Sequence, residues 1–188
     1  MARNYNAIHY MQNKLSGFDQ HFVNAVVRAF NILNDTQSGN ECMSMSACLY
    51  VIAKKYGYSP ELCYGLCKYE GYDFYHAWIE INNTIIDLAI YGNVNFSPYS
   101  LWDNKLDTPL IGSYEELPVH YGKYQFDEDW LTSNISIVTG KTLEQYMDGL
   151  PQNAMWKMVC KILDITPSKT IVNELRLYSK DMLFDKTL

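Results

Sequence analysis

Two apolar segments separated by Asn82 and Asn83 constrain the fold of this chain more than any other feature. Residues 73–81 and 84–90 are rich in β-branched and aromatic side chains, and they alternate with a period of two. Asparagine tolerates positive φ, so a two-residue turn can join the segments without strain. The sequence therefore predicts an antiparallel β-hairpin whose register is set by this turn.

The register of this hairpin sorts its side chains onto two faces. Trp78 opposes Asp87, and His76 opposes Ala89. His76 and Asp87 are then diagonal neighbours with backbones about 7–8 Å apart, close enough for the carboxylate to reach the imidazole. The opposite face is apolar throughout and is predicted to lie in the core; it carries Ala77, Ile79, Ile81, Ile86, Leu88 and Ile90.

Helical periodicity precedes the hairpin. Residues 18–34 repeat apolar side chains at a spacing of 3.6 and predict an amphipathic helix. Turn and cap residues at 34–40 end it, and a second helix is expected from about Glu41 to Gly57. That second helix is apolar on nearly every side, which is typical of a buried helix. A further strand is predicted over residues 62–69.

The second half of the chain follows a different pattern. From residue 91 the sequence is irregular and rich in proline, and two helical patterns follow at residues 142–164 and 168–184. We expect a core with an N-terminal helix over residues 1–95. Residues 96–188 are expected to form an irregular segment and a helical part that packs on the same domain.

Composition and charge argue against several classes of function. Of the 188 residues, 48% are hydrophobic, which is enough for a sizeable core. The net charge is −6 and no cluster of Lys and Arg is present, so we expect no nucleic-acid partner. The sequence has no apolar run of membrane-spanning length and no signal-peptide pattern, so we expect no membrane partner and a cytoplasmic location.

The five cysteines are an odd number in a chain without an export signal, which predicts reduced thiols rather than a disulfide framework. Cys63 and Cys67 are four residues apart, but no second Cys/His pair with zinc-ligand spacing accompanies them. No phosphate-cradling glycine-rich loop is present either. We therefore expect neither a metal nor another cofactor.

Cys42, His76 and Asp87 occur in an order that suits a nucleophile, its base and the group that orients the base. Cys42 lies in the first turn of the expected helix. There the helix dipole and the unpaired N–H groups favour the thiolate and are placed to hold an oxyanion. Cys48 lies in the middle of the same helix and has neither advantage, so Cys42 is the better candidate nucleophile.

Several other side chains are candidates for binding a substrate. Gln37 and Asn40 lie just upstream of Cys42 and have donors suited to an oxyanion hole; the sequence does not choose between them. Tyr64 and Trp78 are candidate substrate contacts, because aromatic residues gather around the expected cleft. The same aromatic residues also suit a peptide-binding module without catalysis, and a buried, inert thiol is the simplest alternative for Cys42.

A resemblance to a known family favours the catalytic interpretation. The segments Gly39–Cys42, His76–Ile81 and Ile85–Leu88 resemble the core of the transglutaminase-like branch of the papain-like cysteine enzymes. Within that branch the chain is similar to the leader-peptide proteases of lasso-peptide biosynthesis and to bacterial transglutaminase-like proteins of unassigned role. The resemblance implies an α+β fold, with the Cys42 helix packed on a small antiparallel sheet, and a catalytic triad of Cys42, His76 and Asp87.

On this basis we expect a cysteine-dependent acyl-transfer enzyme, in the first place a peptidase or amidase acting on a peptide or protein substrate. Transfer of the acyl group to an amine, and an inactive peptide-binding module, are the alternatives. The sequence does not specify the oligomeric state. A triad in this fold is expected to require that the Cys42 helix cover the hairpin face that carries His76, Trp78 and Asp87.

Overall fold

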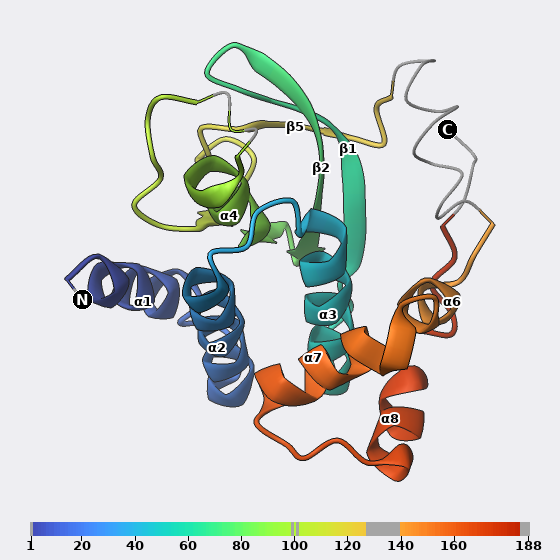
Figure 1. Cartoon of the computed structure of the whole chain (residues 1–188). Coiled ribbons are helices and arrows are strands. Elements are labelled where there is room, and N and C mark those ends of the chain that lie inside the picture. Colours follow the sequence, from blue (N-terminus) through green and yellow to red (C-terminus); the bar gives the residue numbers. More distant parts are fainter. Residues whose placement is uncertain (1, 99, 101, 127–139, 185–188) are drawn as a thin grey trace.

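The computed structural model describes residues 2–98, 100, 102–126 and 140–184 (Figure 1). Five strands form one antiparallel sheet in the order β4-β3-β2-β1-β5. The strands are β1 (Glu61–Tyr69), β2 (Tyr72–Ile81), β3 (Thr84–Asp87), β4 (Leu110–Gly112) and β5 (His120–Lys123). The helices are α1 (Ala2–Lys14), α2 (Gln20–Thr36), α3 (Cys42–Lys55), α4 (Ala89–Phe96), α6 (Leu143–Asp148), the short 3₁₀ helix η2 (Pro151–Asn153), α7 (Ala154–Leu163) and α8 (Lys169–Arg176). The predicted α+β fold is confirmed.

The hairpin of β2 and β3 has the predicted register. Ile81 pairs with Thr84. The turn residues Asn82 and Asn83 have φ angles of 51° and 62°, both in the left-handed region that a type I′ turn requires. The predicted turn is confirmed, and with it the assignment of the β2 side chains to two faces.

The second strand of the hairpin is shorter than predicted. β3 ends at Asp87, where it pairs with β4, and α4 begins at Ala89, so the predicted pairs of Trp78 and His76 do not form. The carboxylate of Asp87 explains the difference, because its Oδ1 accepts the backbone N–H of Ile90 at 3.0 Å. A side chain that satisfies a backbone N–H three residues later competes with strand pairing and starts a helix.

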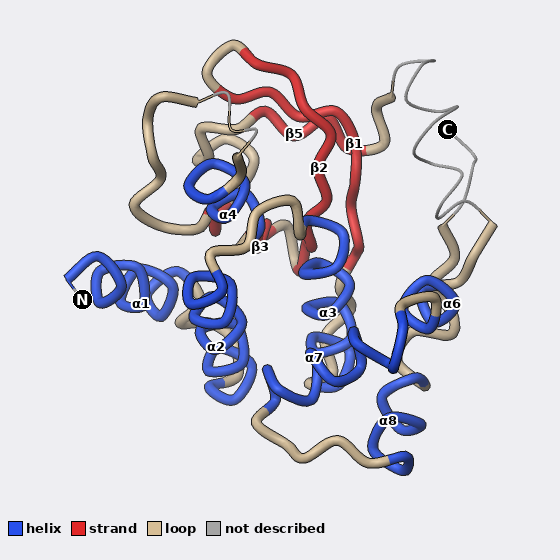
Figure 2. The backbone as a smooth tube through the Cα atoms, in the orientation of Figure 1, coloured by secondary structure: helices blue, strands red, loops and turns tan. Residues whose placement is uncertain are grey.

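Both faces of the sheet are covered. Ala77, Ile79 and Ile81 of β2 share a buried cluster with α3, so this helix packs on the apolar face of the hairpin. Trp78 lies on the other face, in a second buried cluster with residues of α4 and β5. The expectation that the Cys42 helix covers the face of His76 is therefore wrong. Figure 2 shows α2, α3 and α7 grouped beside one another, with the strands adjoining α3.

The second half of the chain supplies parts of both the sheet and the core. The prolines lead us to expect an irregular segment, but β4 and β5 from this segment form the two edges of the sheet. Trp156 and Val159 of α7 lie in the same buried cluster as α2 and α3. In the part of the chain that the structure describes, the helices lack the length and apolar character needed to cross a membrane.

Two glycines allow β1 and β5 to approach closely. A Cβ atom on Gly65 would collide with the carbonyl oxygen of Gly122, and one on Gly122 would collide with the carbonyl oxygen of Leu66. Gly122 follows Tyr121, whose side chain reaches into the middle of the sheet. The absence of side chains at these two positions therefore sets how far β5 lies from the strands that carry the buried polar residues.

We expect Gly122→Ala to lower the free energy of unfolding by about 1–3 kcal/mol, because backbone carbonyls cannot move aside as a flexible side chain can. Urea denaturation followed by circular dichroism measures this change. Gly17→Ala is the matched control, since a Cβ atom there meets nothing within 4 Å. Equal stabilities for the two variants would contradict the close approach of β1 and β5.

Candidate active site

A buried histidine–aspartate pair lies where β2 passes the end of β3. The Nε2 atom of His76 is 2.9 Å from Oδ1 and 2.8 Å from Oδ2 of Asp87. Both side chains are buried, with 3% of His76 and 1% of Asp87 exposed. Because a carboxylate only accepts hydrogen bonds, Nε2 carries the proton and donates it to Asp87. The sequence-predicted neighbours are therefore in contact.

The carboxylate of Asp87 has two further donors. The hydroxyl of Tyr121 donates to Oδ2 at 2.8 Å, and the backbone N–H of Ile90 donates to Oδ1 at 3.0 Å. Burial and the facing carboxylate raise the pKa of Tyr121 well above its usual range, which keeps the hydroxyl protonated as a donor. A buried carboxylate is costly without partners, and here its donors come from a strand, a second strand and a helix start.

Cys42 is the first residue of α3 and lies near His76. The hydroxyl of Ser46, one turn later, donates to the carbonyl oxygen of Ala77 at 3.0 Å, which fixes the start of α3 beside His76. The thiol of Cys42 lies near enough to the imidazole to contribute to raising the pKa of His76. Since Nε2 is occupied by Asp87, Nδ1 is the ring nitrogen left for Cys42.

The electrostatics of His76 depend on these two neighbours. Burial opposes the charged imidazolium, but the charge of Asp87, its hydrogen bond to the ring and the adjacent Cys42 outweigh it and raise the pKa of His76 to about 10. The arrangement therefore favours a proton on the ring when the thiol is ionised. A thiolate beside an imidazolium is the form that attacks a carbonyl carbon.

Asn40 and Asn93 connect the segment before Cys42 to the histidine. The backbone N–H of Asn40 donates to Oδ1 of Asn93 at 2.7 Å, and Nδ2 of Asn93 lies 3.4 Å from Nδ1 of His76. The side chain of Asn40 contacts Ser97 instead, whose hydroxyl donates to it at 3.4 Å. Asn40, a predicted oxyanion candidate, is thus linked to the site through its backbone.

The other predicted side chains lie outside the immediate contacts of the thiol. Gln37 is exposed and ends α2 in the left-handed conformation, where its N–H donates to the last turn of that helix. Tyr64 is buried and packs against the rings of Tyr124 and Phe184. Trp78 is fully buried, and its ring centroid lies 4.7 Å from that of Tyr121. Trp78 therefore supports the tyrosine that bonds Asp87.

One group of side chains has the donor types of a metal site. The ligand atoms of Glu61, Cys63 and Glu80 lie within 4.8 Å of one another. However, Nζ of Lys123 lies 2.7 Å from Glu61 and 3.4 Å from Glu80. Burial raises the pKa of Cys63, which keeps its thiol protonated. The cluster is better described as an ion-pair network at the end of β1 and β2.

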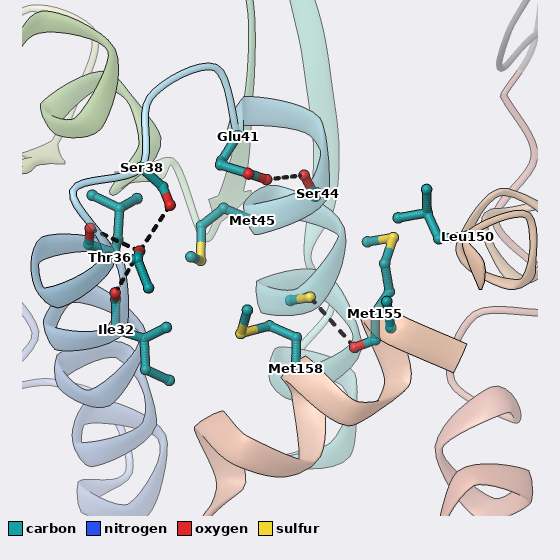
Figure 3. Close-up of a pocket in the computed structure, with 12 residues that line it drawn as sticks. Ile32, Thr36, Ser38, Glu41, Ser44, Met45, Leu150, Met155 and Met158 are labelled. Carbon is teal, nitrogen blue, oxygen red and sulfur yellow. Dashed lines mark hydrogen bonds between the residues drawn. The ribbon is translucent and has the colours of Figure 1, made fainter. Parts of the chain in front are cut away.

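An apolar pocket of about 200 Å³ lies beside the first turns of α3 (Figure 3). It is formed between α2, α3 and α7. At its polar end, Ser44 of α3 donates a hydrogen bond of 2.7 Å to Glu41, the N-cap residue of that helix. The pocket lies on a different side of α3 from Ser46, which faces β2. Its apolar lining consists of Ile32, Leu33, Met45, Cys48, Leu150, Ala154, Met155 and Met158.

Sequence reasoning missed Tyr121 and Asn93. Asn93 lies only six residues after Asp87, but its role depends on the helix that replaces the end of the predicted strand. Tyr121 lies on an edge strand in a segment that the prolines mark as irregular. Alternation over residues 119–123, with Val119 and Tyr121 buried, was the one signal available for it.

We expect Tyr121→Phe to lower the free energy of unfolding by about 1–3 kcal/mol, because a buried carboxylate loses a donor. Chemical denaturation measures it. Tyr114→Phe is the matched control: the hydroxyl of Tyr114 donates to Glu80 at 2.9 Å, but Glu80 is also paired with Lys123 and partly exposed. A larger loss of unfolding free energy for Tyr114→Phe than for Tyr121→Phe would contradict the stabilising role of the hydrogen bond from Tyr121 to Asp87.

Comparison with known proteins agrees with the geometry. Residues 10–100 match the family model described as the transglutaminase-like superfamily. No curated protein and no solved structure matches the chain. The matched segment contains Cys42, His76, Asp87 and Asn93, whereas Tyr121 lies outside it. Over residues 10–100, just under half of the chain, this protein is therefore similar to the transglutaminase-like superfamily.

Proposed function

We propose that this chain is a cysteine-dependent acyl-transfer enzyme that hydrolyses amide bonds in a peptide or protein. The observation that carries the proposal is the buried hydrogen bond between His76 and Asp87, with Cys42 at the start of α3 near enough to raise the pKa of His76. A nucleophile, a base and an orienting carboxylate in contact are what acyl transfer requires.

In the proposed reaction, His76 accepts the thiol proton at Nδ1 as the sulfur of Cys42 bonds to the carbonyl carbon and the oxygen becomes an oxyanion. Collapse of this intermediate breaks the C–N bond, and His76 gives the proton to the leaving amine. Water then attacks the thioester, with His76 as base, and the release of the carboxylic acid restores the thiol. Asp87 holds the ring orientation throughout.

The start of α3 supports an oxyanion site. Its N-cap residue Glu41 does not cap the helix with its side chain, and its carboxylate accepts the hydroxyl of Ser44 instead. The side chain of Glu41 therefore does not satisfy the first N–H groups of the helix. Such N–H groups, together with the positive end of the helix dipole, stabilise negative charge.

The choice of a peptide rests on the family resemblance. Transfer to an amine would use the same thioester, and an inactive binding module would keep the fold without turnover. All five cysteines are free thiols, which supports the cytoplasm as the proposed location.

We expect iodoacetamide at neutral pH to label Cys42 at least about tenfold faster than Cys48. Burial raises the pKa of Cys48 to about 12, so its thiol stays protonated. Mass spectrometry of the two cysteine-containing peptides measures both rates. His76→Ala should lower the labelling rate of Cys42 about tenfold, whereas His9→Ala, which changes an exposed histidine on α1, should leave that rate unchanged. Equal labelling of Cys42 and Cys48 in the natural chain would overturn the proposal.

We expect Cys42→Ala to lower the turnover of a peptide library by about 100-fold or more, because the thioester cannot form. Cys48→Ala is the control and should retain turnover, since Cys48 lies in the middle of α3. Liquid chromatography and mass spectrometry of the products measures both. A natural chain that binds peptides but cleaves none, even with an added amine acceptor, would identify the binding module instead.

A further inference from the structure

Asn93 of α4 contacts both the chain segment that leads to Cys42 and the ring of His76. Its Oδ1 accepts the backbone N–H of Asn40 at 2.7 Å, and its Nδ2 lies 3.4 Å from Nδ1 of His76. The first contact is short, and the second is long for a hydrogen bond. Asn93 therefore connects the nucleophile's segment to the base.

The short contact determines which end of the amide faces the histidine. A backbone N–H can only donate, so Asn40 must meet the amide oxygen of Asn93. The NH₂ group of Asn93 then points to Nδ1 of His76, and an NH₂ group also only donates. The NH₂ group can donate to Nδ1 when that nitrogen carries a lone pair. When Nδ1 is protonated, two donors face each other, which is unfavourable.

We propose that Asn93 is a positioning residue that anchors the segment before Cys42 to His76 and favours the neutral, Nε2-protonated imidazole in the resting site. It thereby opposes transfer of the Cys42 proton to Nδ1 before a substrate is bound. This inference rests on the proposed function only in assigning Nδ1 as the acceptor of that proton. Asp87 and Cys42 favour the imidazolium, and Asn93 acts against them at the same ring.

The other groups around the pair do not duplicate this effect. Burial raises the pKa values of Cys67 and Tyr121, and that of Tyr146 to about 12, so all three stay neutral between pH 6 and 9. The carboxylate of Asp87 is bonded at Nε2 and does not donate to Nδ1. Among the described residues, the titratable groups that interact with Cys42, His76 or Asp87 are Cys67 from β1, Tyr121 from β5 and Tyr146 from α6.

The tautomer and pKa of His76 test the proposal directly by ¹⁵N NMR of the full chain carrying Cys42→Ala, which removes coupling to the thiol. The neutral ring should be protonated at Nε2. Asn93→Leu should raise the pKa of His76 by about 0.5–1 unit, because the donor facing Nδ1 is lost. Asn93→Asp, which keeps an acceptor for Asn40 and places a carboxylate at Nδ1, should raise it further.

Asn95→Leu is the matched control. Asn95 lies on the same helix and exchanges two hydrogen bonds with the backbone of Leu106, at 2.9 and 3.1 Å, on the side away from His76. It should loosen α4 without changing the pKa of His76. An unchanged or lowered pKa in Asn93→Leu, or a rise equal to that in Asn95→Leu, would overturn the proposal.

Alkylation of Cys42 in the otherwise natural chain separates this inference from the proposed function. Asn93→Leu should move the acidic limb of the pH–rate profile to lower pH by about 0.5–1 unit, because a more stable imidazolium favours the thiolate. A rate that falls equally at every pH, with no shift, would show a structural role alone and overturn the proposal. If Cys42 reacts no faster than Cys48, the proposed function fails, while the NMR titration still decides the role of Asn93.

Discussion

The rest of the structure depends on the burial of one carboxylate. Asp87 is 1% exposed and accepts hydrogen bonds from His76, Tyr121 and the backbone of Ile90. An ionised carboxyl group removed from water is stable only when its oxygens are fully occupied by donors. These donors come from β2, β5 and the start of α4. The hydrogen bonds to one carboxylate therefore hold two strands and a helix in place relative to one another. Function and folding make the same demand on this residue.

The end of β3 shows how this demand overrides a local pattern. Residues 84–90 alternate as a strand should, yet the chain turns into α4 once Asp87 takes the N–H of Ile90. The turn has a second effect, because a helix beginning at Ala89 places Asn93 one turn later, beside His76. A strand continued to Ile90 would have carried position 93 away from the ring. The same hydrogen bond thus shortens the sheet and completes the surroundings of the base.

The parts of the site that could be predicted are those controlled by local rules. Turn chemistry at Asn82 and Asn83 sets the hairpin register, and the start of the apolar helix distinguishes Cys42 from Cys48. Tyr121 could not be predicted, because its contact with Asp87 spans 34 residues and depends on two glycines that let β5 approach β1. The side of the sheet on which α3 packs was predicted wrongly, since the sequence pattern indicates which faces are buried but not what covers each.

The difference between the side of a helix and its end explains how α3 can pack on one face of the sheet while Cys42 lies near His76 on the other. The flank of α3 packs on Ala77, Ile79 and Ile81, opposite to the face of His76. Cys42 nevertheless lies near the ring because it is the first residue of α3, and Ser46 holds that end against the carbonyl of Ala77. The flank can therefore be entirely apolar while the end supplies the thiol and the unpaired N–H groups. A nucleophile in the middle of α3 would have to combine burial with reactivity, and the raised pKa of Cys48 shows that these conflict.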